Sequence, residues 1–310
     1  MASRVSRIFL PAREHLGNTN IMRCQPIDAA AWIWHGQVPD DEPVFLRFRC
    51  VFAAADLPLV LHVSADERYV LLLDGQRISR GPDRGDLDHW HYATYRVALD
   101  PGPHTLEAWC WRLLNAAPLA QLSWRGGFIL AAEGPYDAAL TTGKAPWQVV
   151  RLVGQRPVDA GNPDCFGVGA ALEWDARMYP WTNDGAVAAV VVREPVRDKP
   201  WGVVTPGWRL TPSALPDQLD RGIRAGRIVA GGAGILDRDT PVSAEALQWS
   251  ERAAWQAVVA GTHPVTVPPH TTLYVIWDLD EYYCAYPCLE VDGGRDARTT
   301  WGWSEAPYAA

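Results

Sequence analysis

The sequence lacks the signals that mark membrane proteins and nucleic-acid-binding proteins. None of its 310 residues belongs to an apolar run that approaches the ~18 residues of a transmembrane helix. Residues 8–10 form the only apolar run near the N-terminus, which is too short for the core of a signal peptide. The 28 Lys and Arg residues are outnumbered by 36 Asp and Glu residues, and the net charge is -8. Since nucleic acids and anionic membranes attract basic surfaces, we expect neither as a partner, and we expect a cytoplasmic protein.

Common catalytic and metal-binding motifs are also absent. The eight histidines show no HxxxH spacing and the six cysteines show no CxxC pair, so the sequence gives no paired metal ligands. It has no GxSxG motif and no P-loop. Cys50 and Cys110 lie in apolar segments, where a free cysteine behaves as a small hydrophobe. We therefore predict reduced cysteines and no cofactor.

Helical periodicity is scarce, whereas apolar and polar residues alternate in many short segments. Glycine- and proline-rich turn signals recur about every eight to twelve residues, and Asp74-Gly75 is a strong hairpin signal. The pattern predicts an all-β protein with tandem antiparallel β-sandwich domains that are jelly-roll-like. The expected strands of the first domain lie at 44–52, 59–64, 69–73, 105–112 and 126–131. Short helices are expected only at 216–224 and 244–257.

The proline-rich segment 195–216 reads as a linker between two domains. We expect an N-terminal extension at 1–22, a first sandwich at 23–195 and a second sandwich at 196–310. In the second sandwich, 273–279 and 284–291 are expected strands. A further strand at 299–304 lies within a few residues of the chain end. We therefore expect the second sandwich to be incomplete and the chain to be a fragment.

Tryptophan is unusually abundant, with 16 residues, and glycine and proline together contribute 51 (26 + 25). Large flat side chains fill the space between the sheets of a sandwich. They also fit sugar binding, because the apolar face of a pyranose ring stacks on an indole. For any single tryptophan the core is favoured by about three to one, since bulky aromatic side chains are buried on average.

Several segments, taken together, resemble those of bacterial α-L-rhamnosidases in the order in which that family has them. The similar segments are 32–34 with 48–52, ADERYVLLLDG at 65–75, RGPDRGD at 80–86 with 89–95, EWDARMYPW at 173–181, and parts of 277–308. The sequence departs from the family pattern at Asp74, Ala93 and Pro307, where Asn, Asp and Leu are usual. None of these departures touches a residue with an assigned chemical role.

The resemblance implies a parent enzyme that removes terminal α-L-rhamnose with inversion. Two carboxylates on an (α/α)6 helical barrel do this chemistry, one as general acid and one as base. The present sequence shows no long series of amphipathic helices, so no catalytic residue can be carried over. The resemblance therefore implies a scaffold or accessory rhamnose-binding region. Its expected partners are a rhamnose-containing glycan or glycoside and a downstream (α/α)6 catalytic domain of the same polypeptide.

The densest polar cluster is the predicted sugar site, because Arg and Asp beside Trp can bind vicinal hydroxyls and stack on a ring. The predicted carbohydrate-binding residues are Asp66, Arg80, Arg84, Asp86 and Trp90. The alternative interpretation is a long loop held by Arg–Asp pairs, with Trp90 closing the end of the sandwich. For Asp66 the alternative is a turn-stabilising pair with Arg68.

Two further possibilities stay open. Since some sandwiches of the resembled family use calcium, Asn162 with Asp164 and Asn183 with Asp184 are candidate ligands, although such pairs commonly form turns. A self-sufficient glycan hydrolase could use Asp278, Asp280 and Glu281, if burial raised the pKa of one carboxyl. A purely structural sandwich without a ligand is the remaining alternative.

Overall fold

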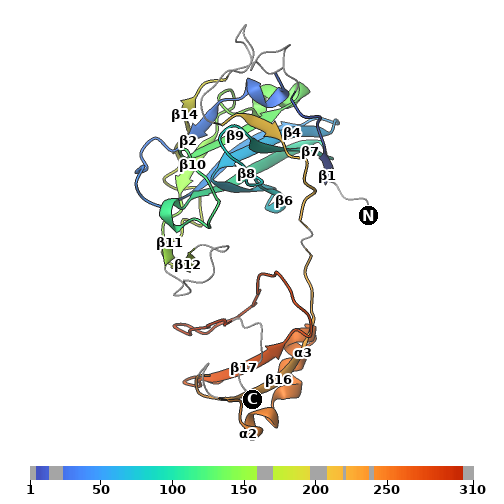
Figure 1. Ribbon diagram of the computed structural model, residues 1–310, viewed down its shortest axis with the longest axis vertical. Coiled ribbons are helices and arrows are strands. Elements are labelled where there is room, and N and C mark those ends of the chain that lie inside the picture. Colours follow the sequence, from blue (N-terminus) through green and yellow to red (C-terminus); the bar gives the residue numbers. More distant parts are fainter. Residues whose placement is uncertain are drawn as a thin grey trace. The chain divides into compact units, whose positions relative to one another are not determined.

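Strands form most of the regular structure, and the prediction of an all-β protein with antiparallel sheets is confirmed (Figure 1). The chain divides into two units, Met1–Asp217 and Gln218–Ala310. The computed structural model describes residues 5–13, 24–158, 170–195, 208–218, 221–236 and 241–302. Among these residues no helix is long and apolar enough to cross a membrane.

The first unit contains a seven-stranded sheet with the order β1-β7-β4-β9-β2-β14 and β15 paired to β7. Its strands are β1 (Val5–Ile8), β2 (Trp32–Trp34), β4 (Leu59–Asp66), β7 (Trp90–Val97), β9 (Gly127–Ala132), β14 (Val190–Arg193) and β15 (Leu210–Pro212). All neighbours are antiparallel except β15, which runs parallel to β7. Because β15 joins this sheet, the first unit reaches Asp217, beyond the boundary at 195 expected from the proline-rich segment.

A six-stranded sheet packs against the seven-stranded sheet, with the order β13-β10-β3-β8-β5-β6. Its strands are β13 (Val187–Ala188), β10 (Gln148–Arg151), β3 (Val44–Ala54), β8 (Gly102–Arg112), β5 (Arg68–Leu73) and β6 (Gln76–Gly81). The turn between β5 and β6 uses Asp74 and Gly75, both with positive φ, as the hairpin signal predicted. The strands expected at 44–52, 59–64, 69–73, 105–112 and 126–131 are all present.

The core lies between the two sheets and follows from period-two alternation. On β3, Leu46, Phe48 and Cys50 are buried, whereas Val51 is exposed. Phe48 packs on Phe128 of β9 across the sandwich, with ring centroids 5.1 Å apart. Burial raises the pKa of the Cys50 thiol to about 11, so this cysteine is an unreactive part of the core.

The outer face of the seven-stranded sheet is covered by segments from elsewhere in the chain. Trp32, Trp90 and Tyr92 point away from the core and are buried with Trp208 and Leu210 in a second apolar cluster. The Trp32 and Trp208 rings stack with centroids 4.0 Å apart. Trp208, which precedes β15 in the chain, therefore covers part of this outer face.

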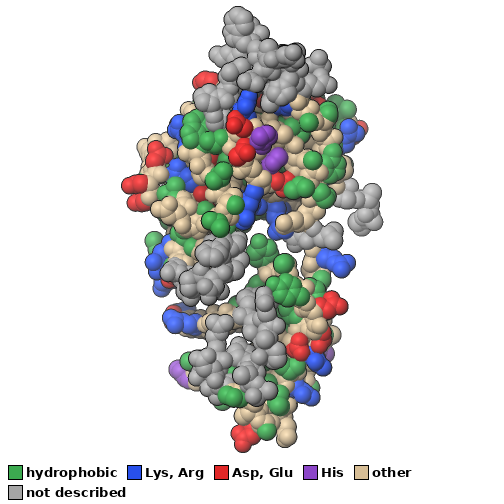
Figure 2. All heavy atoms as spheres, in the orientation of Figure 1, with side chains coloured by type: hydrophobic (Ala, Val, Ile, Leu, Met, Phe, Trp, Pro, Cys, Tyr) green, Lys and Arg blue, Asp and Glu red, His purple; other side chains and the backbone are tan. Residues whose placement is uncertain are grey.

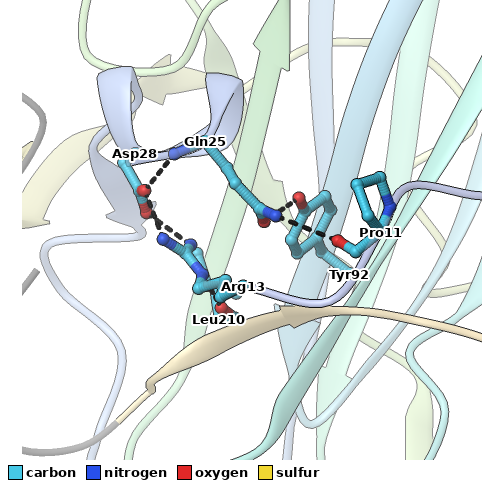
Figure 3. A network of polar contacts seen from close by, with 6 residues as sticks. All are labelled: Pro11, Arg13, Gln25, Asp28, Tyr92 and Leu210. Atoms are coloured by element: carbon cyan, nitrogen blue, oxygen red, sulfur yellow. Dashed lines mark hydrogen bonds and ion pairs between the residues drawn. The ribbon is translucent and has the colours of Figure 1, made fainter. Parts of the chain in front are cut away.

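A buried polar network lies beside this covered face (Figure 3). The Arg13 guanidinium donates two hydrogen bonds to the Asp28 carboxylate, at 2.6 and 2.7 Å, and a third to the Leu210 carbonyl. Gln25 donates its backbone N–H to Asp28 at 2.8 Å and accepts a hydrogen bond from the Tyr92 hydroxyl. The network joins the short helix η1 (Pro26–Ala29), β7 and β15.

Other elements of the first unit are small. They are η2 (Leu114–Ala116), η3 (Gly134–Tyr136), α1 (Asp137–Leu140), β11 (Gln155–Val158) and β12 (Ala171–Trp174). The last two strands pair antiparallel with each other, from Gln155 opposite Trp174 to Val158 opposite Ala171. Their side chains contribute to the candidate site described below.

The second unit contains an antiparallel pair, β16 (Arg227–Ala233) and β17 (Leu273–Asp278), with helices α2 (Ala244–Leu247) and α3 (Arg252–Ala260). The predictions of a strand at 273–279 and a helix within 244–257 are confirmed. The prediction of a strand at 284–291 is wrong, because this segment has no regular secondary structure. The described residues of 216–224 form no helix, and residues 303 and 304 of the predicted strand at 299–304 lie outside the described residues.

Candidate functional site

Two of the five predicted sugar-binding residues are buried. Trp90, at the start of β7, is 3% exposed and donates its indole N–H to the Ala65 carbonyl at 3.1 Å. Asp66, at the end of β4, is fully buried, and one of its carboxylate oxygens accepts three hydrogen bonds. The donors are the backbone N–H groups of Trp124 and Arg125, at 2.8 and 3.2 Å, and the Trp208 indole at 2.8 Å.

Asp66 and its neighbour Glu67 together hold the loop that follows β8. The Glu67 carboxylate accepts the N–H groups of Leu113 and Leu114, at 2.8 and 3.1 Å, where this loop begins. Asp66 binds the loop where it ends, at Trp124 and Arg125. Burial raises the pKa of Asp66, and it raises that of Glu67 to about 7. These two carboxylates therefore fix the loop conformation in this structure.

Two of the remaining predicted residues are solvent-exposed. Arg84 and Asp86 are exposed in the loop between β6 and β7. Arg84 donates to the Leu119 carbonyl at 3.3 Å, and Asp86 accepts the N–H groups of Asp88 and His89. The nearby His89 ring lowers the pKa of Asp86.

Arg80 lies on a different surface, the outer face of the six-stranded sheet. It is paired with Val70 of β5, which is paired with Trp109 of β8. The five predicted residues are thus not brought together into one site, and a binding role for them stays a prediction. Among the described residues, the row of cross-strand partners that begins at Arg80 leads to a group of exposed tryptophans.

Trp109, Trp111, Trp174 and Trp181 form this surface, which we call the tryptophan face. Trp109 and Trp111 point outward from β8, because alternate residues of a strand share one face. The exposed fractions are 39% for Trp109, 52% for Trp174 and 65% for Trp181, whereas Trp111 is half-buried. Exposed tryptophans gathered on one face call for an explanation, since large exposed apolar patches usually mark binding sites.

Tyr179 packs near both parts of this face, the part on β8 and the part formed by Trp174 and Trp181. It is 7% exposed and packs in an apolar cluster with Phe45 and Val150, against which Trp111 also packs. Its ring centroid lies 4.8 Å from that of Trp181 and 5.5 Å from that of Trp174. Trp174 and Trp181 are 6.0 Å apart and tilted by 41°. A buried tyrosine thus supports two exposed indoles.

Arg47 of β3 holds the same segment to the sheet. It is paired with Trp109, is 8% exposed, and donates a hydrogen bond to the Thr182 carbonyl. Burial raises the pKa of Tyr179, and this effect outweighs the charge and hydrogen bond of Arg47, which act in the opposite direction. Next to Trp174, Asp175 and Arg177 form a two-pronged ion pair, which lowers the pKa of Asp175 to about 2.

A polar row runs beside the tryptophan face on the same sheet. Glu107 of β8 is paired with Arg49 of β3, and their charged groups lie 3.8 Å apart. Gln148 of β10 is paired with Arg49 and accepts a hydrogen bond from the Asn183 amide at 2.9 Å. The face therefore offers aromatic rings beside hydrogen-bond donors and acceptors. On the side of the first unit shown in Figure 2, acidic and basic side chains are interspersed.

The residues of this face stand out in the sequence only as strand positions or as part of a resemblance, and none of them is a predicted site residue. Trp174 and Trp181 lie in the segment 173–181, which was informative only as a resemblance. A usable signal existed in β8, where alternation places Leu106, Ala108 and Cys110 in the core. Trp109 and Trp111 then fall on the outward side, where polar residues are expected.

The described carboxylates at and after the end of β17 give no indication of an acid–base pair. Asp278 is bound by Arg227 at 3.2 Å, and a hydrogen bond from the Asp280 N–H together with this arginine lowers its pKa. Asp280 binds the same arginine at 3.3 Å, and Glu281 accepts a hydrogen bond from the Tyr283 hydroxyl. A general acid needs a raised pKa, and here the pKa of Asp278 is lowered.

Of the two candidate calcium-binding pairs, the structure describes only Asn183 with Asp184. The Asn183 amide is bound to Gln148, and Asp184 accepts a hydrogen bond from the Thr182 hydroxyl at 2.7 Å. Asn162 and Asp164 lie outside the described residues. Within the described ranges no three His, Cys, Asp or Glu side chains are grouped as metal ligands.

Comparison with known proteins gives a structural relationship to α-L-rhamnosidases. No protein-family model and no curated protein matches the sequence. The GH78 family rhamnosidase of Bacillus sp. GL1 is similar over 66% of this chain, with 26% identity and a TM-score of 0.50. Weaker matches are the α-L-rhamnosidase of Streptomyces avermitilis (71% of this chain and 18% of that chain, 17% identity, TM-score 0.36) and the Pleurotus ostreatus lectin (63% and 48%, 16% identity, TM-score 0.36). The match spans 21% of the Bacillus enzyme, so this chain resembles a part of a GH78 rhamnosidase, at the level of family structure.

Proposed function

We propose that the first unit is a non-catalytic carbohydrate-binding β-sandwich of an α-L-rhamnosidase-like glycoside hydrolase. Its ligand is a rhamnose-containing glycan or glycoside, bound on the tryptophan face. The observation that carries the proposal is the exposure of Trp109, Trp174 and Trp181 beside hydrogen-bonding side chains. The likeness to the Bacillus rhamnosidase supports the choice of sugar.

Sugar recognition follows from the chemistry of both partners. One face of a pyranose ring exposes C–H groups, which pack on the electron-rich face of an indole. Its hydroxyl groups need donors and acceptors such as Gln148, Asn183 and the Arg49–Glu107 pair. Because the ligand stays partly in water on an open face, we expect weak binding of a single sugar, with a Kd of about 1 mM.

Isothermal titration calorimetry with L-rhamnose tests the proposal. We expect saturable binding by the unmodified chain and loss of at least tenfold in affinity in the Trp174→Ala/Trp181→Ala variant. Trp301→Ala, which removes a similarly exposed tryptophan from the second unit, is the matched control and should bind like the unmodified chain. The absence of heat at high millimolar sugar, or equal loss in the control, would contradict the proposal.

The catalytic carboxylates are proposed to belong to a separate helical-barrel domain of the same polypeptide, as the resemblance implies. The lowered pKa of Asp278 supports this, because a general acid needs a raised pKa. The purified chain should therefore not hydrolyse an aryl α-L-rhamnoside. Turnover that is lost in Asp278→Asn would favour the self-sufficient hydrolase instead. Repeating the calorimetry with calcium and with a chelator tests whether a metal takes part.

A further inference from the structure

The tryptophan face is continuous across several strands. Arg80, Val70, Trp109 and Arg47 are successive cross-strand partners on β6, β5, β8 and β3. Directly paired residues of neighbouring strands project from the same side of a sheet. The four residues therefore form one row across the outer face, and Trp109 is the exposed aromatic ring at its centre.

The row continues toward the segment that follows β12. Arg47 donates to the Thr182 carbonyl, next in sequence to Trp181. Trp111 lies two residues from Trp109, about 7 Å along β8, and packs against the cluster that contains Tyr179. Trp181 lies beyond Tyr179, with ring centroids 4.8 Å apart. Trp109 and Trp181 are thus linked through Arg47 and Thr182, without a ring contact between them among the described residues.

This spacing matters because one sugar ring covers about one indole. Trp174 and Trp181 lie 6.0 Å apart, whereas no ring contact within the described residues joins Trp109 to either of them, so we expect one stacked rhamnose to cover only one of the two positions. Trp109 is nevertheless exposed, and the polar pair Glu107–Arg49 and Gln148 lie in the neighbouring row. The face therefore provides more stacking positions and more polar groups than one sugar can use.

From this arrangement we infer that the tryptophan face binds an extended oligosaccharide over several sugar units, with one stacking position at Trp174 and Trp181 and another at Trp109. The inference rests on the proposed carbohydrate-binding function. It assigns the ligand as a chain segment rather than a single terminal sugar. Arg47 is a positioning residue in this arrangement, since it ties the two positions together through Thr182.

Separate stacking positions predict how affinity depends on chain length. A monosaccharide can use only one position at a time, whereas a longer chain uses both without a second loss of translational freedom. Affinity should therefore rise with chain length by more than the statistical gain. That gain is a factor equal to the number of identical sugar units that could occupy one position. Trp109 should matter only to ligands long enough to reach it.

The test is calorimetry with L-rhamnose and with rhamno-oligosaccharides up to the tetrasaccharide, using the full chain. For the unmodified chain we expect at least a tenfold higher affinity for the tetrasaccharide than for the monosaccharide. Trp109→Ala should reduce tetrasaccharide affinity about tenfold and leave the monosaccharide unchanged, and Trp109→Phe should restore part of the loss. The Trp174→Ala/Trp181→Ala variant should weaken both ligands.

The outcomes separate the two proposals. Two results would overturn the extended-ligand inference while leaving monosaccharide binding intact. One is a tetrasaccharide affinity that exceeds the monosaccharide affinity by no more than the statistical gain. The other is an unchanged tetrasaccharide affinity in Trp109→Ala. No binding of any sugar would overturn the proposed function, and the inference with it. Unchanged urea denaturation of Trp109→Ala verifies that a loss of affinity is not a loss of folding.

Discussion

The two outer faces of the first unit carry similar aromatic residues and differ in what covers them. On the seven-stranded sheet, Trp32 and Trp90 are buried under Trp208 and the residues fastened by Arg13 and Asp28. On the six-stranded sheet, Trp109 has no such cover and remains 39% exposed. The comparison shows that an outward tryptophan in a sandwich becomes part of the core only when a distant segment of the chain covers it.

The difference also indicates function. Burying a tryptophan side chain is favourable by a few kcal/mol, so the covered face gains stability from its aromatic residues. The tryptophan face gains little from Trp109, Trp174 and Trp181 in the free protein. Residues that contribute little to folding yet are grouped together are expected to contribute to binding.

The largest effect is expected when the cover of the seven-stranded sheet is damaged. Trp208→Ala removes a buried ring that stacks on Trp32 at 4.0 Å and deletes the indole donor to Asp66. We expect a loss of about 4 kcal/mol in the free energy of unfolding, measured by urea denaturation. A loss below about 1 kcal/mol would show that the cover does not stabilise this face.

A somewhat smaller effect is expected at the buried ion pair beneath it (Figure 3). Asp28→Ala leaves the buried Arg13 guanidinium without its carboxylate, which should cost about 3 kcal/mol in unfolding free energy. In the double variant Arg13→Met/Asp28→Leu no charge is left unpaired, so much of that loss should be recovered. If the double variant is no more stable than Asp28→Ala, the pair does not act as a unit.

The third effect concerns pH and the loop that begins after β8. Burial raises the pKa of Glu67 from 4.5 to about 7, so the folded protein binds more protons than the unfolded chain between these values. The stability contributed by Glu67 is therefore fully present below pH 4.5 and falls as the pH rises to 7, by about 3 kcal/mol.

The comparison of the unmodified chain with Glu67→Gln isolates this contribution. The pKa of Asp66 is also raised and that of His62 is lowered by burial, and both groups remain in the variant. Relative to the unmodified chain, Glu67→Gln should gain stability as the pH rises from 4.5 to 7. A difference that does not change with pH would mean that Glu67 ionises normally.

The smallest effect on stability is expected on the tryptophan face. Trp109→Ala and Trp181→Ala remove rings that are already exposed, so unfolding free energies should change by less than about 1 kcal/mol. A loss as large as that of Trp208→Ala would mean that these rings are part of the core, and it would remove the contrast between the two faces.

The strands and their inner faces could be predicted from the sequence because they depend on local patterns. The alternation of β3 and β8, and the Asp74-Gly75 turn between β5 and β6, are readable within a few residues. The pattern of 284–291 is equally strand-like, yet it forms no strand, since a strand also needs a neighbour with which to pair.

The candidate site could not be predicted in the same way. Trp90 and Trp109 both lie on alternating strands, and the first is buried in a cluster that includes Trp208, more than a hundred residues beyond it in sequence. The predicted residues Asp66 and Trp90 stood out for their chemical types, but both are buried with hydrogen-bond partners. Exposure, which selects Trp174 and Trp181, is a property of the folded chain.

The most direct test follows the indole N–H signals of the assigned tryptophans by NMR while a rhamno-oligosaccharide is added. The account predicts that the signals of Trp109, Trp174 and Trp181 shift with saturation, whereas those of Trp32, Trp90 and Trp208 stay in place. Shifts confined to the covered tryptophans, or binding without any shift on the tryptophan face, would contradict it.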